Sequence, residues 1–155
     1  MTVDLHHEAF QRLALVEARK NPHAPFGCVI VDPQRGEVVA RGFNRSRASR
    51  LLHGEIDALL DLEPPDGAAP RLVLYTTAEP CPMCAGACYF AGIDQIVYGV
   101  SIPELQRFGF DQLELRCHEV TGSGSRPVTI VGGVLHDECL ALFDTARALR
   151  ARRVD

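Results

Sequence analysis

Helical and strand periodicities alternate along the first two thirds of the chain. Some stretches repeat apolar residues every three or four positions, and others are short β-branched runs bounded by turn residues. This alternation indicates an α/β fold with helices on both faces of a mixed sheet. The predicted helices cover residues 5–20, 53–62 and 82–91, and the predicted strands cover residues 26–31, 37–42, 72–77 and 95–100.

The pattern is weaker beyond residue 100. It predicts a short helix over residues 103–109, strands over 113–120 and 128–131, and a final amphipathic helix over 137–150. The sequence Gly122-Ser123-Gly124-Ser125 is typical of a flexible connection. Because sheets of this kind bind ligands at the ends of their strands, we expect the helices that begin near residues 53 and 82 to converge on one site there.

Composition and charge narrow the class of protein. A chain of 155 residues fits a single domain, taken as residues 1–155. The formal net charge of -4 argues against a protein that coats nucleic acid. No apolar run is long enough to span a bilayer, and residues 1–10 carry acids and histidines where a signal peptide would need a basic start and an apolar stretch. We therefore expect a cytoplasmic protein without membrane contact.

The six cysteines fall into two groups. In the cytoplasm thiols stay reduced, so a disulfide framework is not expected. Four of them have apolar neighbours, and free cysteine in such surroundings packs as a small apolar residue. These four are Cys28, Cys88, Cys117 and Cys139. The remaining pair, Cys81 and Cys84, has the spacing of metal ligands.

The stretch Pro80-Cys81-Pro82-Met83-Cys84 predicts a zinc site together with His53. A catalytic zinc takes three protein ligands and keeps one position open for water. Pro82 suits the first position of a helix, so Cys81 would cap that helix and Cys84 would occupy its third position. Both sulfurs would then lie at the helix N-terminus, where the dipole favours thiolate. Glu55 follows His53 by two residues, off its helical face, and could reach a water in the open position.

Two other uses of these residues stay open at this point. A structural zinc site needs four protein ligands, and no fourth Cys or His has an evident spacing, since Cys88 lies a turn further into the helix. A thioredoxin-like redox Cys-x-x-Cys would leave His53-Gly54-Glu55 without a role. The metal content of the purified protein separates these alternatives. About one tightly held zinc per chain supports a zinc site, either structural or catalytic, whereas no zinc favours the redox motif.

The motifs in this order and spacing resemble the cytidine/deoxycytidylate deaminase superfamily, in the branch with guanine deaminases, cytosine deaminases and tRNA adenosine deaminases. The H-x-E and P-C-x-x-C pair is the signature of its zinc nucleobase deaminases. The matching segments are Pro25-Phe26-Gly27-Cys28-Val29-Ile30-Val31, Gly42-Phe43-Asn44, His53-Gly54-Glu55-Ile56, Tyr75-Thr76-Thr77-Ala78-Glu79-Pro80-Cys81-Pro82-Met83-Cys84-Ala85-Gly86-Ala87 and Val97-Tyr98-Gly99.

The resemblance implies a fold and a reaction. The fold would be a three-layer α/β/α sandwich around a central mixed five-stranded sheet. The reaction would be hydrolytic deamination of a nucleobase or nucleoside, with one Zn²⁺ per chain held by His53, Cys81 and Cys84 and no organic cofactor. Zinc lowers the pKa of a bound water towards neutrality. Glu55 would take the water's proton and pass protons to the ring nitrogen and the leaving amine.

The resemblance also implies substrate contacts, each with a plainer alternative. An amide such as that of Asn44 can both donate and accept, although asparagine is also a common turn residue. Phe26 would wall the pocket, although a phenylalanine in a β-run is usually core. The backbone at Ala78 and Glu79, with the Glu79 side chain, would line the pocket. Gly109-Phe110-Asp111 is similar to a guanine deaminase motif in which Asp111 would recognise the base, or it is a turn before a strand.

We expect a free nucleobase or nucleoside as the substrate, and tRNA is the alternative. A tRNA editor needs a basic surface, and the basic segment Ala146–Arg153 is explained by the helix dipole alone. The tRNA branch typically has alanine where Gly54 stands here. The arginines between residues 41 and 50 form a solvated face or hold a phosphate near the pocket. The family is commonly dimeric, and the apolar residues Met83, Tyr89 and Phe90 predict a homodimer.

Overall fold

One mixed five-stranded sheet, with the strand order β2-β1-β3-β4-β5, forms the centre of the computed structural model, which describes residues 6–153. β1 pairs antiparallel with both β2 and β3, whereas β3, β4 and β5 run parallel to one another. The predicted mixed sheet is therefore confirmed. The strands are β1 (Gly27–Asp32), β2 (Glu37–Phe43), β3 (Val73–Ala78), β4 (Gln95–Val100) and β5 (Thr129–Val131).

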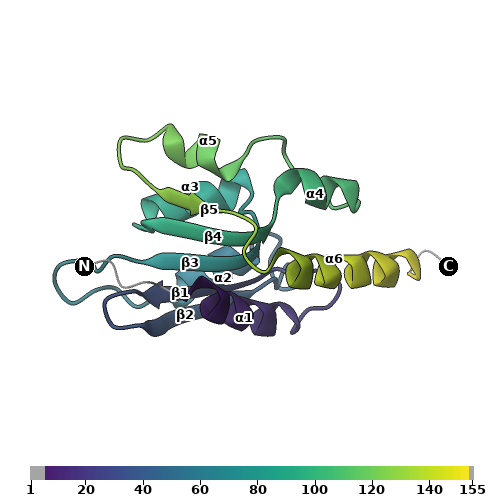
Figure 1. The fold of residues 1–155 in the computed structure, drawn as a ribbon, viewed down its shortest axis with the longest axis horizontal. Helices are drawn as coiled ribbons and strands as arrows, with labels where there is room; N and C mark the ends of the chain where they lie inside the picture. The colour runs from purple at the N-terminus through teal and green to yellow at the C-terminus, as the bar shows by residue number, and fades with distance from the viewer. Residues whose placement is uncertain (1–5, 154–155) are drawn as a thin grey trace.

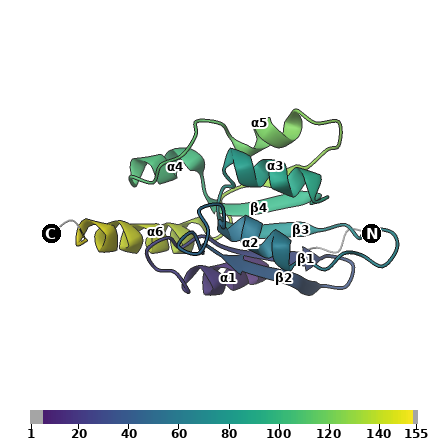
Figure 2. The same cartoon turned by 180° about the vertical axis from the view of Figure 1, so that it is seen from behind.

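Helices cover both faces of this sheet, which gives the expected three layers (Figure 1). α1 and α6 lie on one face, and α2 and α3 lie on the opposite face, as the view from behind shows (Figure 2). The shorter α4 and α5 lie beyond the β4 side of the sheet. The helices are α1 (His7–Ala18), α2 (Gly54–Asp61), α3 (Pro82–Phe90), α4 (Ile102–Arg107), α5 (Cys117–Gly122) and α6 (His136–Ala151).

Alternate residues of the central strands fill two separate cores. Val29 and Tyr75 pack in the cluster on the α1 face. Ile30, Leu74 and Ile96 pack in the cluster on the face covered by α2 and α3. β1 and β3 are buried along their whole length, which explains why their sequences are nearly uninterrupted apolar runs.

The helix boundaries agree with the sequence pattern to within a few residues. α1 begins at His7, and the expected start at Leu5 lies outside the described residues. α3 begins with Pro82 at its first position and has Cys81 as its N-cap, as predicted. Across residues 6–153, none of the helices combines the length and apolarity needed to cross a membrane.

The predicted strand over residues 113–120 is wrong. Its alternating Leu113 and Leu115 are exposed by 69% and 42%, and the place beside β4 is taken by β5. The segment ends in α5, which begins at Cys117. The Cys117 amide donates to the buried carboxylate of Glu79 at 3.0 Å, and the Arg116 amide donates to the Glu119 side chain at 2.8 Å, so a long-range contact and a local cap together fix the helix start.

The connection predicted at residues 122–125 is exposed, and one of its glycines lies against a side chain of α3. A Cβ on Gly124 would lie 2.4 Å from ring atoms of Tyr89, so this glycine permits a close contact. The next loop is held to the same residue, since the Arg126 amide donates to the Tyr89 hydroxyl at 3.1 Å. The Arg126 guanidinium also lies over the Tyr89 ring at 4.8 Å.

A glycine contact sets how closely α2 approaches the sheet. A Cβ on Gly42 of β2 would lie 2.3 Å from the Ala58 nitrogen and 2.4 Å from the Gly54 carbonyl oxygen, both backbone atoms of α2. A backbone cannot yield as a side chain can, so α2 would have to shift. Any such shift would move the N-terminus of α2, where His53 and Glu55 lie.

We expect Gly42→Ala to lower the free energy of unfolding by about 1–3 kcal/mol, as overpacking does. The matched control is Gly86→Ala in α3, where an added Cβ meets nothing within 4 Å. That control should raise the free energy of unfolding by roughly 0.5–1 kcal/mol, because alanine restricts the unfolded chain and favours a helix. Urea unfolding of both variants measures the difference, and equal effects would show that α2 is not held at this contact.

Candidate active site

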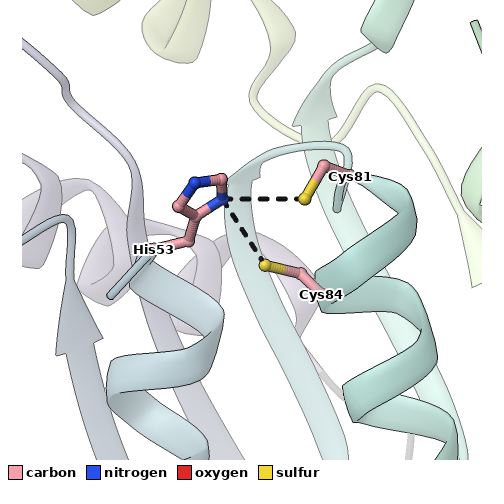
Figure 3. Close-up of side chains that lie close together, drawn as sticks. All are labelled: His53, Cys81 and Cys84. Carbon is pink, nitrogen blue, oxygen red and sulfur yellow. Dashed lines mark hydrogen bonds between the residues drawn. The ribbon is translucent and has the colours of Figure 1, made fainter. Parts of the chain in front are cut away.

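Two helix N-termini bring the predicted metal ligands together. His53 is the N-cap of α2 and Cys81 is the N-cap of α3, both with extended backbone conformations. The His53 Nδ1 atom lies 3.6 Å from Cys81 Sγ and 3.7 Å from Cys84 Sγ. Figure 3 shows the imidazole ring facing both sulfur atoms. Residues separated by about thirty positions therefore form one cluster, as the sequence predicts.

The cluster has the dimensions of a zinc site. Zinc lies about 2.3 Å from thiolate sulfur and about 2.0–2.1 Å from imidazole nitrogen, which places the two ligand atoms of a tetrahedral site about 3.6 Å apart. The observed separations of 3.6 and 3.7 Å match this value. In the described part of the chain, the group has three members, and a fourth Cys, His or carboxylate does not join it. Three ligands and one free position are typical of a catalytic zinc rather than a structural one.

The thiols of this cluster differ in acidity. The hydrogen bond from Cys84, followed by the one from His53, lowers the pKa of Cys81 to about 4. The pKa of Cys84 is raised well above its ordinary value, since Cys84 donates to Cys81 and is also buried. The two shifts have opposite directions because the two thiols share one hydrogen bond. A divalent cation in this position would hold both sulfurs as thiolates.

Glu55 lies beside the cluster in the first turn of α2 and is only 3% exposed. Burial is the main reason why the pKa of its carboxyl is raised, and the nearby Cys81 adds to the effect. Thr76 Oγ1 lies 3.3 Å from a Glu55 oxygen and 3.0 Å from the carbonyl oxygen of Ala78, so one hydroxyl hydrogen serves two acceptors. A buried carboxyl with a raised pKa is suited to moving protons near neutral pH.

The cluster opens into a pocket of about 240 Å³. The inner wall of this pocket includes the buried Glu55, and its outer wall includes the exposed Asp111 and Arg150. The pocket therefore leads from the predicted metal ligands to solvent. Its wall combines residues from segments distributed over most of the chain. These are Ala24, Phe26, Asn44, Ser46, His53, Glu55, Glu79, Cys81, Phe110, Asp111, Gln112 and Arg150.

Asn44 is held with a defined orientation in this wall. Its side-chain oxygen accepts hydrogen bonds from the Ser46 amide at 3.2 Å and the Ser46 hydroxyl at 2.8 Å. Its backbone is fixed by a bond to the carbonyl oxygen of Phe26 at 2.9 Å. Since Ser46 occupies the oxygen, the amide nitrogen of Asn44 is the atom suited to a ligand.

Phe26 and Asp111 also reach the pocket. Phe26 is half-buried, and its ring meets those of Phe143 and Phe110 edge to face, with centroids 5.0 and 5.8 Å away. Phe26 therefore serves both the core and the pocket wall. Asp111 is exposed at the mouth, following Phe110, which is buried among the same rings. The turn at Gly109, with a φ of 80°, directs the chain from α4 to this position.

The structure places Ala78 and Glu79 differently from one another. Ala78 is fully buried in the core, and it is not among the residues that line the pocket. Glu79 reaches the wall, but its carboxylate accepts bonds from the Ile102 amide, the Cys117 amide and Arg116 Nε at 2.8–3.0 Å. The Glu79 carboxylate therefore anchors the starts of α4 and α5. Glu79 stays a candidate for substrate contact only because it lines the pocket.

The arginines of residues 41–50 divide into paired and free side chains. Arg45 forms a close ion pair with Asp57, whose other oxygen accepts from the Phe43 amide at 3.1 Å. Arg41 lies 3.6 Å from Glu17. The ion pairs of Arg45 and Arg41 therefore connect β2 and the residues after it to α2 and α1. Arg47 and Arg50 are exposed, in keeping with the expected solvated face.

Several functional neighbours could not be recognised from the sequence. Thr76 resembled an ordinary strand residue, and Ser46 resembled a loop residue. Arg150 was assigned to the helix dipole, yet it reaches the pocket from the last helix. Thr76 contacts Glu55, 21 positions away, and Arg150 contacts His23, 127 positions away, whereas Ser46 forms a local turn with Asn44. Residue type alone carries no signal for the two long-range contacts.

The comparisons with known proteins agree with this site. Residues 5–100 match the family model of the cytidine and deoxycytidylate deaminase zinc-binding region. The "Probable cytosine deaminase" of Schizosaccharomyces pombe is 30% identical over 129 residues, which cover 80% of each chain. A tRNA-specific adenosine deaminase of Streptococcus pyogenes is 37% identical over 107 residues, which cover 64% of each chain, so this chain spans just under two thirds of that relative.

Solved structures extend the similarity to the whole fold. The structure of guanine deaminase from Nitrosomonas europaea has a TM-score of 0.78 and 29% sequence identity, covering 96% of this chain and 86% of the other. A complex of guanine deaminase with 8-azaguanine has a TM-score of 0.80 and 29% identity, covering 93% of this chain and 87% of the other.

Proposed function

The chain belongs to the cytidine and deoxycytidylate deaminase family, and we propose that it is a zinc-dependent enzyme that hydrolyses the amine from a small heterocyclic amidine. The substrate would be a free nucleobase or a nucleoside, and ammonia would be released. One observation carries this proposal. Two residues of a three-ligand zinc-type cluster, His53 and Cys81, line the same pocket as the buried carboxylate of Glu55.

Each part of the site has a role in this reaction. When bound to His53, Cys81 and Cys84, zinc lowers the pKa of a water molecule and so makes a nucleophile available near neutral pH. Glu55 accepts the proton of that water and delivers protons to the ring nitrogen and to the departing amine. A carbon–oxygen bond forms, the carbon–nitrogen bond breaks, and ammonia leaves. Thr76 holds Glu55 in place through its hydroxyl.

A purine or pyrimidine base fits the chemistry of the pocket wall. The Phe26 ring can pack against a flat ring. The Asn44 amide nitrogen can donate to a ring carbonyl or nitrogen, and Asp111 can accept from an amine or a ring N–H. The guanine deaminase complex with 8-azaguanine and the S. pombe relative support guanine- or cytosine-type substrates.

The identity to tRNA-specific adenosine deaminases supports a second candidate, deamination of adenosine in tRNA. RNA binding of this kind depends on several phosphate contacts from lysine and arginine. The formal net charge of this chain is -4, and two of the arginines of residues 41–50, Arg41 and Arg45, are already paired with acids. We therefore favour the small substrate.

Ammonia release from a substrate panel tests the proposal. The zinc-loaded protein would be incubated with guanine, cytosine, guanosine, cytidine and a tRNA anticodon stem-loop that carries adenosine. We expect release from at least one base or nucleoside. Release from the stem-loop alone would replace this proposal with the tRNA candidate. A protein that holds zinc and releases ammonia from none of them would support a structural zinc site.

We expect Asn44→Ala to lower kcat/KM for the best panel substrate by about tenfold, the value of one hydrogen bond in the substrate complex. The matched control is Asn21→Ala, because the Asn21 side chain donates only to the backbone carbonyl of Asn44 at 3.0 Å and does not line the pocket. Steady-state kinetics of both variants compares the two effects. A larger loss in the control would assign Asn44 a purely structural role.

We also propose a homodimer that uses the outer surface of α3. Phe90 is 88% exposed and Met83 is 37% exposed on this helix, and large exposed apolar groups favour association. Tyr89 instead packs against Gly124 and contributes less than the sequence suggested. Light scattering at micromolar concentration should show a dimer that Phe90→Asp weakens. Val16→Asp, which changes an exposed residue of α1 on the opposite face, should leave the dimer intact.

A further inference from the structure

Arg150 of α6 is held in a fixed position at the mouth of the pocket. Its Nε atom donates to the carbonyl oxygen of His23 at 2.8 Å. The guanidinium carbon lies 4.2 Å from the centroid of the Phe110 ring, a geometry that favours a cation. Arg150 also lines the pocket that His53 and Glu55 line. Its planar group is therefore preorganised next to the place where the substrate would sit.

The terminal nitrogen atoms of Arg150 are free for a ligand. Within the described range, 6–153, no carboxylate lies at ion-pair distance from this side chain, and its one recorded hydrogen bond uses Nε. Arg147, one turn earlier on the same helix, differs in this respect because it pairs with Asp144 and stacks on Phe108. An unpaired guanidinium can donate two parallel hydrogen bonds, which match the spacing of two oxygen atoms of a phosphate or a carboxylate.

Charged groups of both signs lie near Arg150. Arg153 Nη2 lies 3.5 Å from His23 Nε2. Partial burial, and then the charges of Arg153, Arg47 and Arg150, keep the pKa of His23 below its ordinary value. Arg150 and Arg153 thus both contact His23. The acidic groups of the same pocket are the exposed Asp111 and the buried carboxylates of Glu55 and Glu79.

We propose that Arg150 is a specificity-determining residue that binds an anionic substituent, a phosphate or a carboxylate, on the ring whose amine is removed at the opposite end of the pocket. Arg153, which contacts the same His23 that Arg150 binds, adds a second positive charge on this side. The inference rests on the proposed deaminase function and narrows its substrate class. The preferred substrate would be a charged derivative rather than the free base.

A small anion fits this site better than a nucleic acid does. The pocket of about 240 Å³ accommodates one ring system and a short substituent. Arg150 is the one arginine among the residues that line the pocket, and the formal net charge of the chain is -4, whereas an RNA backbone is bound through several phosphate contacts.

Two matched substrate pairs test this inference on the zinc-loaded enzyme. One pair is guanosine and guanosine 5′-monophosphate, and the other is pterin and pterin-6-carboxylate, so that the arms distinguish phosphate from carboxylate. Ammonia release gives the ratio of kcat/KM for the charged member over the neutral member. Equilibrium binding of the same compounds by calorimetry gives a readout that does not depend on turnover.

The variants separate charge from packing. Arg150→Leu keeps an apolar cover on Phe110 and removes the charge, whereas Arg150→Lys keeps the charge and removes the fork. We expect Arg150→Leu to lower the charged-to-neutral ratio by about tenfold to a hundredfold, and Arg150→Lys to recover part of it. Arg147→Ala is the matched control on the same helix and should leave the ratio unchanged. Thermal melting confirms that each variant is folded.

The outcomes distinguish this inference from the proposed function. If the wild type binds the charged member of a pair more tightly and Arg150→Leu abolishes this preference, the inference stands even where no ammonia is released. If ammonia is released with equal efficiency from both members of each pair, the enzyme is a deaminase and the inference is wrong. Preference for a short oligoribonucleotide over both charged compounds, with the same dependence on Arg150, would also overturn it.

Discussion

Replacing Glu55 with glutamine is expected to lower the rate of ammonia release by about 10²–10⁴-fold, the range for loss of a general acid–base group. Glutamine keeps the shape and the contact with Thr76 but cannot accept the proton of the attacking water. The metal ligands are untouched, since Glu55 is not a member of the His53, Cys81 and Cys84 cluster. Zinc content should therefore stay at about one per chain while turnover disappears.

The control for this variant is Glu37→Gln, which neutralises a carboxylate of β2 that is more than half exposed and paired with Arg35. Its ammonia release and zinc content should equal those of the wild type. Steady-state rates together with elemental analysis give both quantities for each protein. Near wild-type turnover by Glu55→Gln would remove Glu55 from the mechanism and leave the pocket without an identified base.

Cys84→Ser is expected to reduce bound zinc from about one per chain to almost none after dialysis against a chelator, and to abolish ammonia release. Cys84 is fully buried at the N-terminal turn of α3, where its sulfur faces His53. Serine retains the size of the side chain but offers a neutral hydroxyl in place of a thiolate. The sheet and its two cores do not include the cluster, so the far-ultraviolet circular dichroism spectrum should change little.

Cys88→Ala is the matched control on the same helix. Cys88 is equally buried but packs in the core next to Ile30 and Ile96, one turn beyond Cys84. It should retain zinc and lose only about 1 kcal/mol of the free energy of unfolding, a typical effect of a core substitution. Unfolding of Cys84→Ser on zinc loss would instead indicate a structural metal. Zinc loss in Cys88→Ala with retention in Cys84→Ser would reverse the ligand assignment.

The central site could be predicted from the sequence because its parts are local motifs. Pro82 at the first position of a helix placed Cys81 at the cap, and that geometry depends only on neighbouring residues. The spacing of His53 and Glu55 likewise follows from the first turn of α2. The alternation of buried strands and amphipathic helices before residue 100 was sufficient to predict the three layers, although β5 and α6, which complete the sheet and one helical layer, lie beyond it.

The remainder depends on contacts that no local pattern records. The segment 113–120 has strand alternation, but its position is set by Glu79, which binds the amide of Cys117 and the side chain of Arg116. Arg150 has the appearance of an ordinary cation at a helix C-terminus, and only the docking of α6 brings it to Phe110. Tertiary position, not residue type, assigns both of these roles.

The residues predicted to hold the reactive centre and those proposed to contact the rest of the substrate come from different elements. α2 and α3 supply the former, whereas Asn44 follows β2, Asp111 follows α4 and Arg150 ends α6. We therefore expect amino-acid substitutions in these three segments to change the substrate specificity without affecting the deamination step. With such a layout, related proteins can evolve different substrate specificities while they keep the same reaction.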